Sequence, residues 1–186
     1  MTVLRNFFQL FVPLALLFSA QSALAQLDLG IPSRYSVTLK AGSGQHAGTK
    51  SRIGVRLYSE NLKRWSNKKY VRGIEAGSAR YLNFLLSPSF TKISQLEVSE
   101  NNADGLRVNV SLLNRNSGDV SLFTHKARWI KDGRAVLKLI EVVLADSYHC
   151  CDNNNDCSGP VDLLTQCGPG RTLVWCREED NQSICD

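Results

Sequence analysis

The sequence predicts an all-β fold, an antiparallel β-sandwich of about eight strands followed by a small disulfide-rich C-terminal extension. Three observations lead to this prediction. Apolar and polar residues alternate with a period of two in several segments of residues 26–146. Short runs rich in Gly, Asn, Ser and Asp separate these segments at regular intervals. All six cysteines lie among the last 37 residues.

The first 25 residues have the pattern of a signal peptide. Arg5 precedes an apolar run from Phe7 to Phe18, and the small residues Ala23 and Ala25 stand where a signal peptidase requires them. Residues 1–25 therefore predict a secreted, extracellular protein. No later segment approaches the ~18 consecutive apolar residues of a membrane span, so we expect no transmembrane segment after residue 25.

The strands of the body, residues 26–146, are predicted from the alternation. It is clearest at 35–40, 52–57, 82–86, 95–99 and 106–112, and weaker at 69–74 and 120–130. The run 136–145 is apolar enough to predict a central strand that is covered on both faces. No segment of the body combines helical periodicity with helix caps.

Composition and charge restrict the function. With 43% hydrophobic and 21% charged residues, the 186-residue chain is neither disordered throughout nor a coiled coil. Residues 26–145 contain 19 Lys or Arg against 9 Asp or Glu, whereas residues 146–186 contain 2 against 8. Because a basic body favours anionic partners, we expect the chain to bind an anionic lipid surface, an extracellular protein or a glycan. We do not expect it to bind nucleic acid.

The cysteines predict a disulfide framework within the extension, residues 147–186. They are Cys150, Cys151, Cys157, Cys167, Cys176 and Cys185. An even number in an exported chain predicts three intrachain bridges, and six cysteines allow 15 pairings. Because a bond between the adjacent Cys150 and Cys151 would be strained, each should bond elsewhere. A zinc site with His149 is not expected, since exported thiols usually oxidise.

A resemblance to a known family is carried by residues 35–58. Tyr35, Val37 and Gly42 are followed by Ala47-Gly48-Thr49 and then by a strand with Ile53, Val55 and Leu57. This pattern resembles the opening hairpin of a PLAT (lipoxygenase-homology) domain. The resemblance implies an eight-stranded sandwich and a binding module, usually for lipid surfaces or protein partners. In calcium-binding members an acidic residue follows Ala-Gly-Thr, but here that residue is Lys50, so we expect no metal and no cofactor.

Catalysis and other metal sites have little support. The sequence lacks the Gly-x-Ser-x-Gly, His-Glu-x-x-His and phosphate-loop motifs, so no catalytic residue is assigned. Asp152, Asn154 and Asp156 match the first ligands of an EF-type calcium loop. Cys157 stands where the calcium loop requires a glycine, and Leu163 stands where it requires the twelfth ligand. We therefore interpret this segment as a polar turn. A small secreted hydrolase remains an alternative.

The most suggestive binding segment is a group of cations around one indole. It consists of Lys63, Arg64, Trp65, Lys68 and Lys69. Trp beside Lys and Arg suits a membrane interface, where the cations meet anionic phosphates. The alternative is that Trp65 and Tyr70 belong to the core and the cations solvate an edge strand. The sequence therefore predicts a secreted, non-catalytic binding module with a PLAT-like body. The first alternative is a secreted inhibitor or effector that acts through the cysteine-rich tail, and the second is the small secreted hydrolase.

Overall fold

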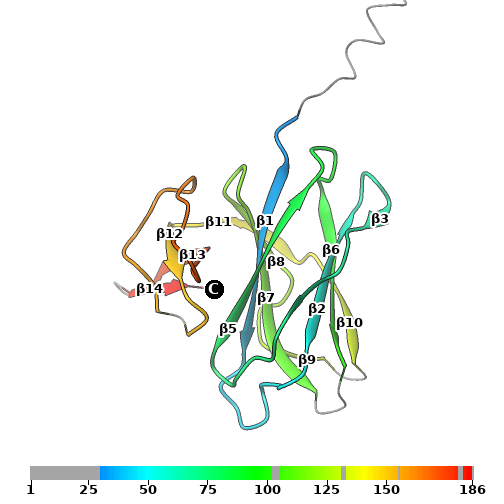
Figure 1. Ribbon diagram of the computed structural model, residues 1–186, viewed down its shortest axis with the longest axis vertical. Helices are drawn as coiled ribbons and strands as arrows, with labels where there is room; N and C mark the ends of the chain where they lie inside the picture. Colours follow the sequence, from blue (N-terminus) through cyan, green and yellow to red (C-terminus); the bar gives the residue numbers. More distant parts are fainter. Residues whose placement is uncertain (1–29, 102–104, 131–132, 155, 180–181, 186) are drawn as a thin grey trace, which may run out of the picture. The chain divides into compact units, whose positions relative to one another are not determined.

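The computed structural model describes residues 30–101, 105–130, 133–154, 156–179 and 182–185, and the regular structure of these residues is β-strand (Figure 1). The predicted signal peptide, residues 1–25, lies outside the described residues. Pro32–Asp186 form one compact unit. Within the described part of the chain, no helix has the length and hydrophobicity needed to cross a membrane.

Two antiparallel sheets make up the body. The first has the order β11-β8-β7-β1-β5, with β9 paired to β7. Its strands are β1 (Ser33–Ala41), β5 (Ala79–Leu86), β7 (Leu106–Asn114), β8 (Asp119–Leu122), β9 (Arg128–Ile130) and β11 (Glu141–Leu144). The second has the order β10-β6-β2-β3, with β4 paired to β2. Its strands are β2 (Ile53–Ser59), β3 (Arg64–Trp65), β4 (Lys69–Val71), β6 (Ile93–Glu100) and β10 (Arg134–Lys138).

The core confirms the all-β prediction, because the alternating apolar residues of the two sheets pack into one cluster. Val37 and Leu39 on β1, Val55 and Leu57 on β2 and Leu96 on β6 are each fully buried. A period of two directs such residues to one face of each sheet, and the two inner faces meet.

The prediction of a central strand over residues 136–145 is wrong. β10 ends at Lys138 and β11 begins at Glu141, and they are edge strands of different sheets. Val142 and Leu144 are 55% and 75% exposed. The segment crosses from one sheet to the other, so neither half is covered on both faces. Only some of its apolar residues are covered, since Leu137 is buried in the core whereas its neighbour Val136 is 40% exposed.

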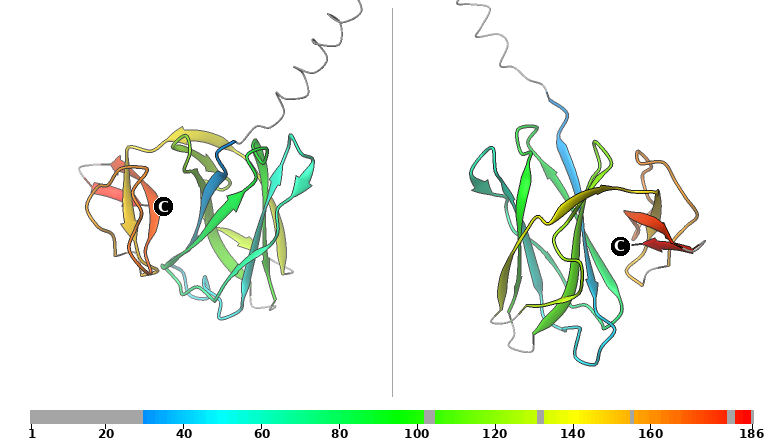
Figure 2. Two further views of the ribbon diagram at one scale, coloured as in Figure 1. Left: turned by 45° about the horizontal axis from the view of Figure 1, so that its top comes forward. Right: turned by 180° about the vertical axis from the view of Figure 1, so that it is seen from behind.

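The extension forms a third, three-stranded antiparallel sheet. Its order is β12-β13-β14. The strands are β12 (Ser147–Cys151), β13 (Thr172–Glu179) and β14 (Gln182–Cys185). Figure 1 shows this sheet beside the strands β1 and β7, and the orange and red strands keep that place in both views of Figure 2.

The extension covers the outer face of the first sheet. Ser36, Thr38 and Ser111 alternate with core residues and so point away from the core, yet only 3%, 4% and 6% of their surfaces are exposed. Trp175 of β13 is fully buried against this face, and its indole Nε1 donates a hydrogen bond to Ser111 Oγ at 3.1 Å. The apolar contacts form a second cluster. Its buried members are Leu113, Val120, Leu122, Cys150, Leu173 and Trp175.

The six cysteines form three disulfides, as the even count predicts. Cys150 bonds Cys167, Cys151 bonds Cys157, and Cys176 bonds Cys185. The adjacent Cys150 and Cys151 thus bond elsewhere, which fixes one point of β12 to two loops. Such a framework is typical of extracellular or secreted proteins and supplies stability that about 40 residues do not obtain from a core of their own.

Iodoacetamide labelling tests this framework. Under denaturing, non-reducing conditions none of the six cysteines should be alkylated, because all are in disulfides. Peptide mapping without reduction should recover the three pairs named above. Alkylation of two or more cysteines, or recovery of a different set of pairs, would contradict the prediction.

Candidate functional site

The outer face of the second sheet gathers cations and aromatic rings from strands that are distant in sequence. Strand register places Arg134, Ser99, Gly54 and Tyr70 in one row across β10, β6, β2 and β4. A parallel row contains Lys138, Gln95, Tyr58 and Trp65. Between them, Glu97 lies opposite Arg56. We call this surface the basic-aromatic face; it comprises Arg52, Arg56, Tyr58, Trp65, Lys68, Tyr70, Glu97, Arg134 and Lys138.

Gly54 explains how the long side chains approach the sheet. A Cβ atom at this position would lie 2.8 Å from Lys68 Cδ and 2.9 Å from Tyr70 Cε1. The absent side chain therefore leaves room for Lys68 and Tyr70 to lie over β2. Tyr70 is 47% exposed, so the ring is available at the surface rather than part of the core.

The aromatic rings of this face are stacked with guanidinium groups. Arg52 lies over the Tyr70 ring with Cζ 4.0 Å from the centroid, and Arg56 lies over the Trp65 ring at 4.7 Å. The centroids of Tyr58 and Trp65 are 5.2 Å apart. Cation–π contacts of this kind hold the rings and the charges in fixed relative positions.

One buried carboxylate organises the cations. Glu97 is 1% exposed and receives Arg56 Nη2 at 2.7 Å, Lys68 Nζ at 2.9 Å and Arg134 Nη2 at 2.5 Å. Burial by itself raises the pKa of the Glu97 carboxyl, but the hydrogen bonds and charges of Arg56 and Lys68 outweigh it and lower the pKa overall. The three cations exceed the charge of the carboxylate, so the face stays positive.

The structure separates the five residues that the sequence grouped. Trp65 and Lys68 lie on the basic-aromatic face, with Trp65 half-buried. Lys63 is exposed at the turn that joins β2 to β3, and Arg64 is exposed at the start of β3. Lys69 points elsewhere, because its Nζ donates to the Asn83 carbonyl and lies 5.4 Å from the Phe84 centroid, both on β5.

Sequence reasoning missed Arg52, Arg56, Arg134 and Lys138. The alternation of β2 and β10 already contained a signal, because Arg56 alternates with the apolar Val55 and Leu57 and must point outward. The missing information was the pairing of β2, β6 and β10, which brings together residues about 40 and 80 positions apart.

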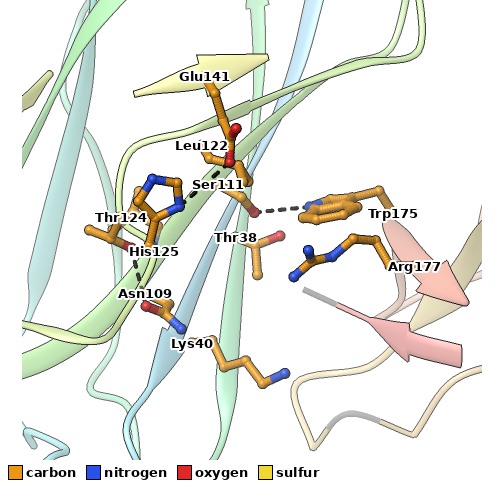
Figure 3. A pocket seen from close by; sticks show the side chains of 11 residues that line it. Thr38, Lys40, Asn109, Ser111, Leu122, Thr124, His125, Glu141, Trp175 and Arg177 are labelled. Carbon is orange, nitrogen blue, oxygen red and sulfur yellow. Dashed lines mark hydrogen bonds and ion pairs between the residues drawn. The ribbon is translucent and has the colours of Figure 1, made fainter. Parts of the chain in front are cut away.

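A second candidate is a polar pocket of about 230 Å³ between the body and the extension (Figure 3). Lys40 of β1 and Arg177 of β13 line it together with Asn109 of β7. Lys40 Nζ donates to the Cys185 carbonyl at 3.1 Å, and Thr124 Oγ1 donates to Asn109 Oδ1 at 3.2 Å. These donors make the pocket suitable for a small polar molecule.

The same pocket contains Ser111, His125 and Glu141, the residue types of a hydrolase triad, but not the hydrogen bonds of one. His125 Nδ1 lies 3.5 Å from Glu141 Oε1, and both side chains are about half exposed. Ser111 Oγ accepts its hydrogen bond from Trp175, and no hydrogen bond joins it to His125 among the described residues. A serine nucleophile needs its base within hydrogen-bond reach, and Ser111 and His125 do not have that contact here.

The Ala47-Gly48-Thr49 segment has a packing role. Thr49 and Ile74 exchange two backbone hydrogen bonds of 2.8 Å, which join this loop to the chain after β4. A Cβ atom at Gly48 would lie 2.4 Å from the Ile74 carbonyl oxygen, so no side chain fits there. Lys50 lines a cavity beside this loop.

Comparisons with known proteins bear on the fold. No family model and no curated protein matches this chain. Two crystal structures of the lipoxygenase variant Delta413-417:GS LOX align with 20% identity. One has a TM-score of 0.51 over 63% of this chain, and the other, solved anaerobically in complex with arachidonate, has a TM-score of 0.50 over 62%.

The chain spans only about 17% of those lipoxygenase chains. A coral 8R-lipoxygenase, described as activated by calcium through a C2-like domain, aligns with 21% identity over 61% of this chain and 17% of its own, at a TM-score of 0.48, too low to bear on the fold. At 20% identity the similarity concerns architecture alone, and the sandwich of this chain therefore has a PLAT-like fold.

Proposed function

We propose that this chain is a secreted, non-catalytic binding module that attaches to anionic lipid surfaces through its basic-aromatic face. The observation that carries the proposal is the composition of that face, where five cations and three aromatic rings surround a single carboxylate that is already neutralised. The signal-peptide pattern, the three disulfides and the PLAT-like fold support the same function.

The face has the chemistry of a peripheral membrane contact. An exposed cation near an anionic bilayer contributes about 1 kcal/mol, and Tyr and Trp favour the headgroup region. Arg52 and Lys138 are exposed at opposite sides of the face, and Arg64 borders it at β3. None of these three cations contacts Glu97, so their removal leaves the buried ion cluster unchanged.

Co-sedimentation with vesicles tests the proposal. The triple variant Arg52→Ser, Arg64→Ser, Lys138→Ser should bind phosphatidylserine vesicles about 100-fold more weakly than wild type, since three cations contribute about 3 kcal/mol. Wild-type binding should weaken with added salt and should be absent on phosphatidylcholine.

A matched control keeps the change in net charge but moves it off the face. Arg107, Lys126 and Arg128 are exposed on β7, on the segment before β9 and on β9, respectively. Their replacement by serine should reduce binding severalfold at most. Equal losses in both triple variants would mean that net charge alone acts, and equal binding by wild type and the face variant would reject the proposal. If the wild-type protein is retained on immobilised sulfated glycan or acidic protein but does not bind vesicles, that ligand would replace the lipid surface as the proposed partner.

A further inference from the structure

Two adjoining cavities lie where the first sheet, β4 and the loop before β13 meet. Their volumes are about 430 Å³ and 250 Å³. Asn83 of β5, Arg115 after β7 and Gln166 of the extension line both cavities. Arg34 and Lys69 line the larger one, and Arg171 lines the smaller one. We call the two together the Arg115 groove.

The charge of this groove is almost uncompensated. Of the four cations, Arg171 forms an ion pair with Asp156 at 3.2 Å. Arg34, Lys69 and Arg115 have no carboxylate partner among the described residues, and Lys69 is bonded to the Asn83 carbonyl. No acidic residue lines either cavity. Three cations that share one groove without a counter-ion favour a bound anion.

Arg115 is the group whose position is hardest to explain by structure alone. Its Nη2 donates to the Thr165 carbonyl at 3.3 Å, but its Nε is buried and has no hydrogen-bond partner. Burial, and next the charge of Arg34, lower the pKa of the Arg115 guanidinium. Arg115 is thus a partly buried cation with an unpartnered Nε and no carboxylate beside it, an arrangement that a bound anion would stabilise.

The uncharged groups of the groove suit a polar organic molecule. Asn83 Oδ1 accepts a hydrogen bond from Ser36 Oγ at 2.7 Å, which leaves the Asn83 Nδ2 hydrogens for another acceptor. Gln166 adds a second amide from the extension. Leu85 is 65% exposed at the edge of the larger cavity and offers apolar contact. The volume exceeds that of a single ion, so the anion belongs to a larger molecule.

We propose that the Arg115 groove binds a phosphate monoester, with Arg115 and Arg34 holding the phosphate oxygens and Asn83 and Gln166 holding the hydroxyl groups of the attached molecule. A monoester carries a charge of about −1.5 to −2 at neutral pH, which matches three unpaired cations better than a carboxylate does. The planar guanidinium donates two parallel hydrogen bonds to such a group. The monoester comes either from a lipid headgroup or from a soluble sugar phosphate.

This site is separate from the basic-aromatic face and stands without it. Lys68 and Lys69 are neighbours in the chain, but Lys68 is paired with Glu97 on the outer face of the second sheet and Lys69 lies over Phe84 of β5. Variants of the basic-aromatic face should therefore leave the Arg115 groove intact, and the converse should hold.

The test is NMR titration of the ¹⁵N-labelled full chain, observed at the side-chain Nε–H of Arg115. Inorganic phosphate should shift this signal saturably, whereas sodium chloride of equal ionic strength should not. Arg34→Ser removes an exposed side chain and should weaken phosphate binding at least tenfold. Arg115→Gln should do the same, and Arg128→Ser, at the opposite end of β7, should change it less than twofold.

Vesicles distinguish the two sources of the monoester. The groove would be assigned to a lipid headgroup if wild type binds phosphatidate vesicles, Arg34→Ser reduces this binding tenfold, and glucose 6-phosphate gives no saturable response. A response to glucose 6-phosphate would assign it to a soluble ester. Unchanged phosphate affinity in Arg34→Ser and in folded Arg115→Gln, or an equal response to chloride, would overturn the proposal. Loss of phosphatidylserine binding in the basic-aromatic variant has no bearing on these outcomes.

Discussion

Replacement of Trp175 by alanine should lower the free energy of unfolding by about 4 kcal/mol, the usual cost of removing a buried tryptophan. Trp175 is 1% exposed and packs with Leu113, Val120 and Leu122 of the first sheet. It therefore contributes to the contact between extension and body rather than to the extension alone. Unfolding in urea, followed by far-UV circular dichroism, measures the loss without relying on the removed fluorophore.

Two milder variants separate packing from hydrogen bonding. Trp175→Phe keeps most of the buried ring but loses the donor to Ser111, so it should cost about 2 kcal/mol. Ser111→Ala leaves the indole N–H without its acceptor and should cost about 1 to 3 kcal/mol. A change below 1 kcal/mol in Trp175→Ala would mean that the extension does not stabilise the body.

What the sequence predicts well is what depends on local pattern. The buried positions of β1, β2 and β7 follow from alternation, because a strand with one covered face has a period of two. The number of disulfides follows from the even number of cysteines in a chain predicted to be exported, whereas their pairing does not.

What the sequence does not predict depends on contacts between distant segments. Thr38 and Ser111 look like solvent-facing residues, and the docking of Trp175 beside them explains their burial. The run 136–145 looks central because hydrophobicity does not reveal that the chain changes sheets after Lys138. The partners of Glu97 come from β2, β10 and the segment before β4, so no local motif identifies the cluster.

Replacement of Glu97 by glutamine should be the second severe change, with a loss of about 3 kcal/mol at neutral pH, because removing one member of a buried ion cluster leaves the others uncompensated. The folded-state pKa of Glu97 lies below its ordinary value of 4.5. The ionised carboxylate therefore stabilises the protein fully above that pH, and this contribution is lost as the pH falls through the folded-state pKa.

The free energy of unfolding, measured in urea from neutral pH down to about pH 3, should thus converge for wild type and Glu97→Gln as the pH falls. Glu141→Gln is the matched control, since Glu141 is 46% exposed and pairs with the exposed His125; it should cost at most about 1 kcal/mol. A constant difference between wild type and Glu97→Gln at all pH values would contradict the ion-cluster role.

Because Glu97→Gln also removes the one negative charge of the basic-aromatic face, the folded variant should bind phosphatidylserine vesicles at least as tightly as wild type. A lower stability together with undiminished binding would identify Glu97 as the residue that positions the cations rather than one that contacts the lipid.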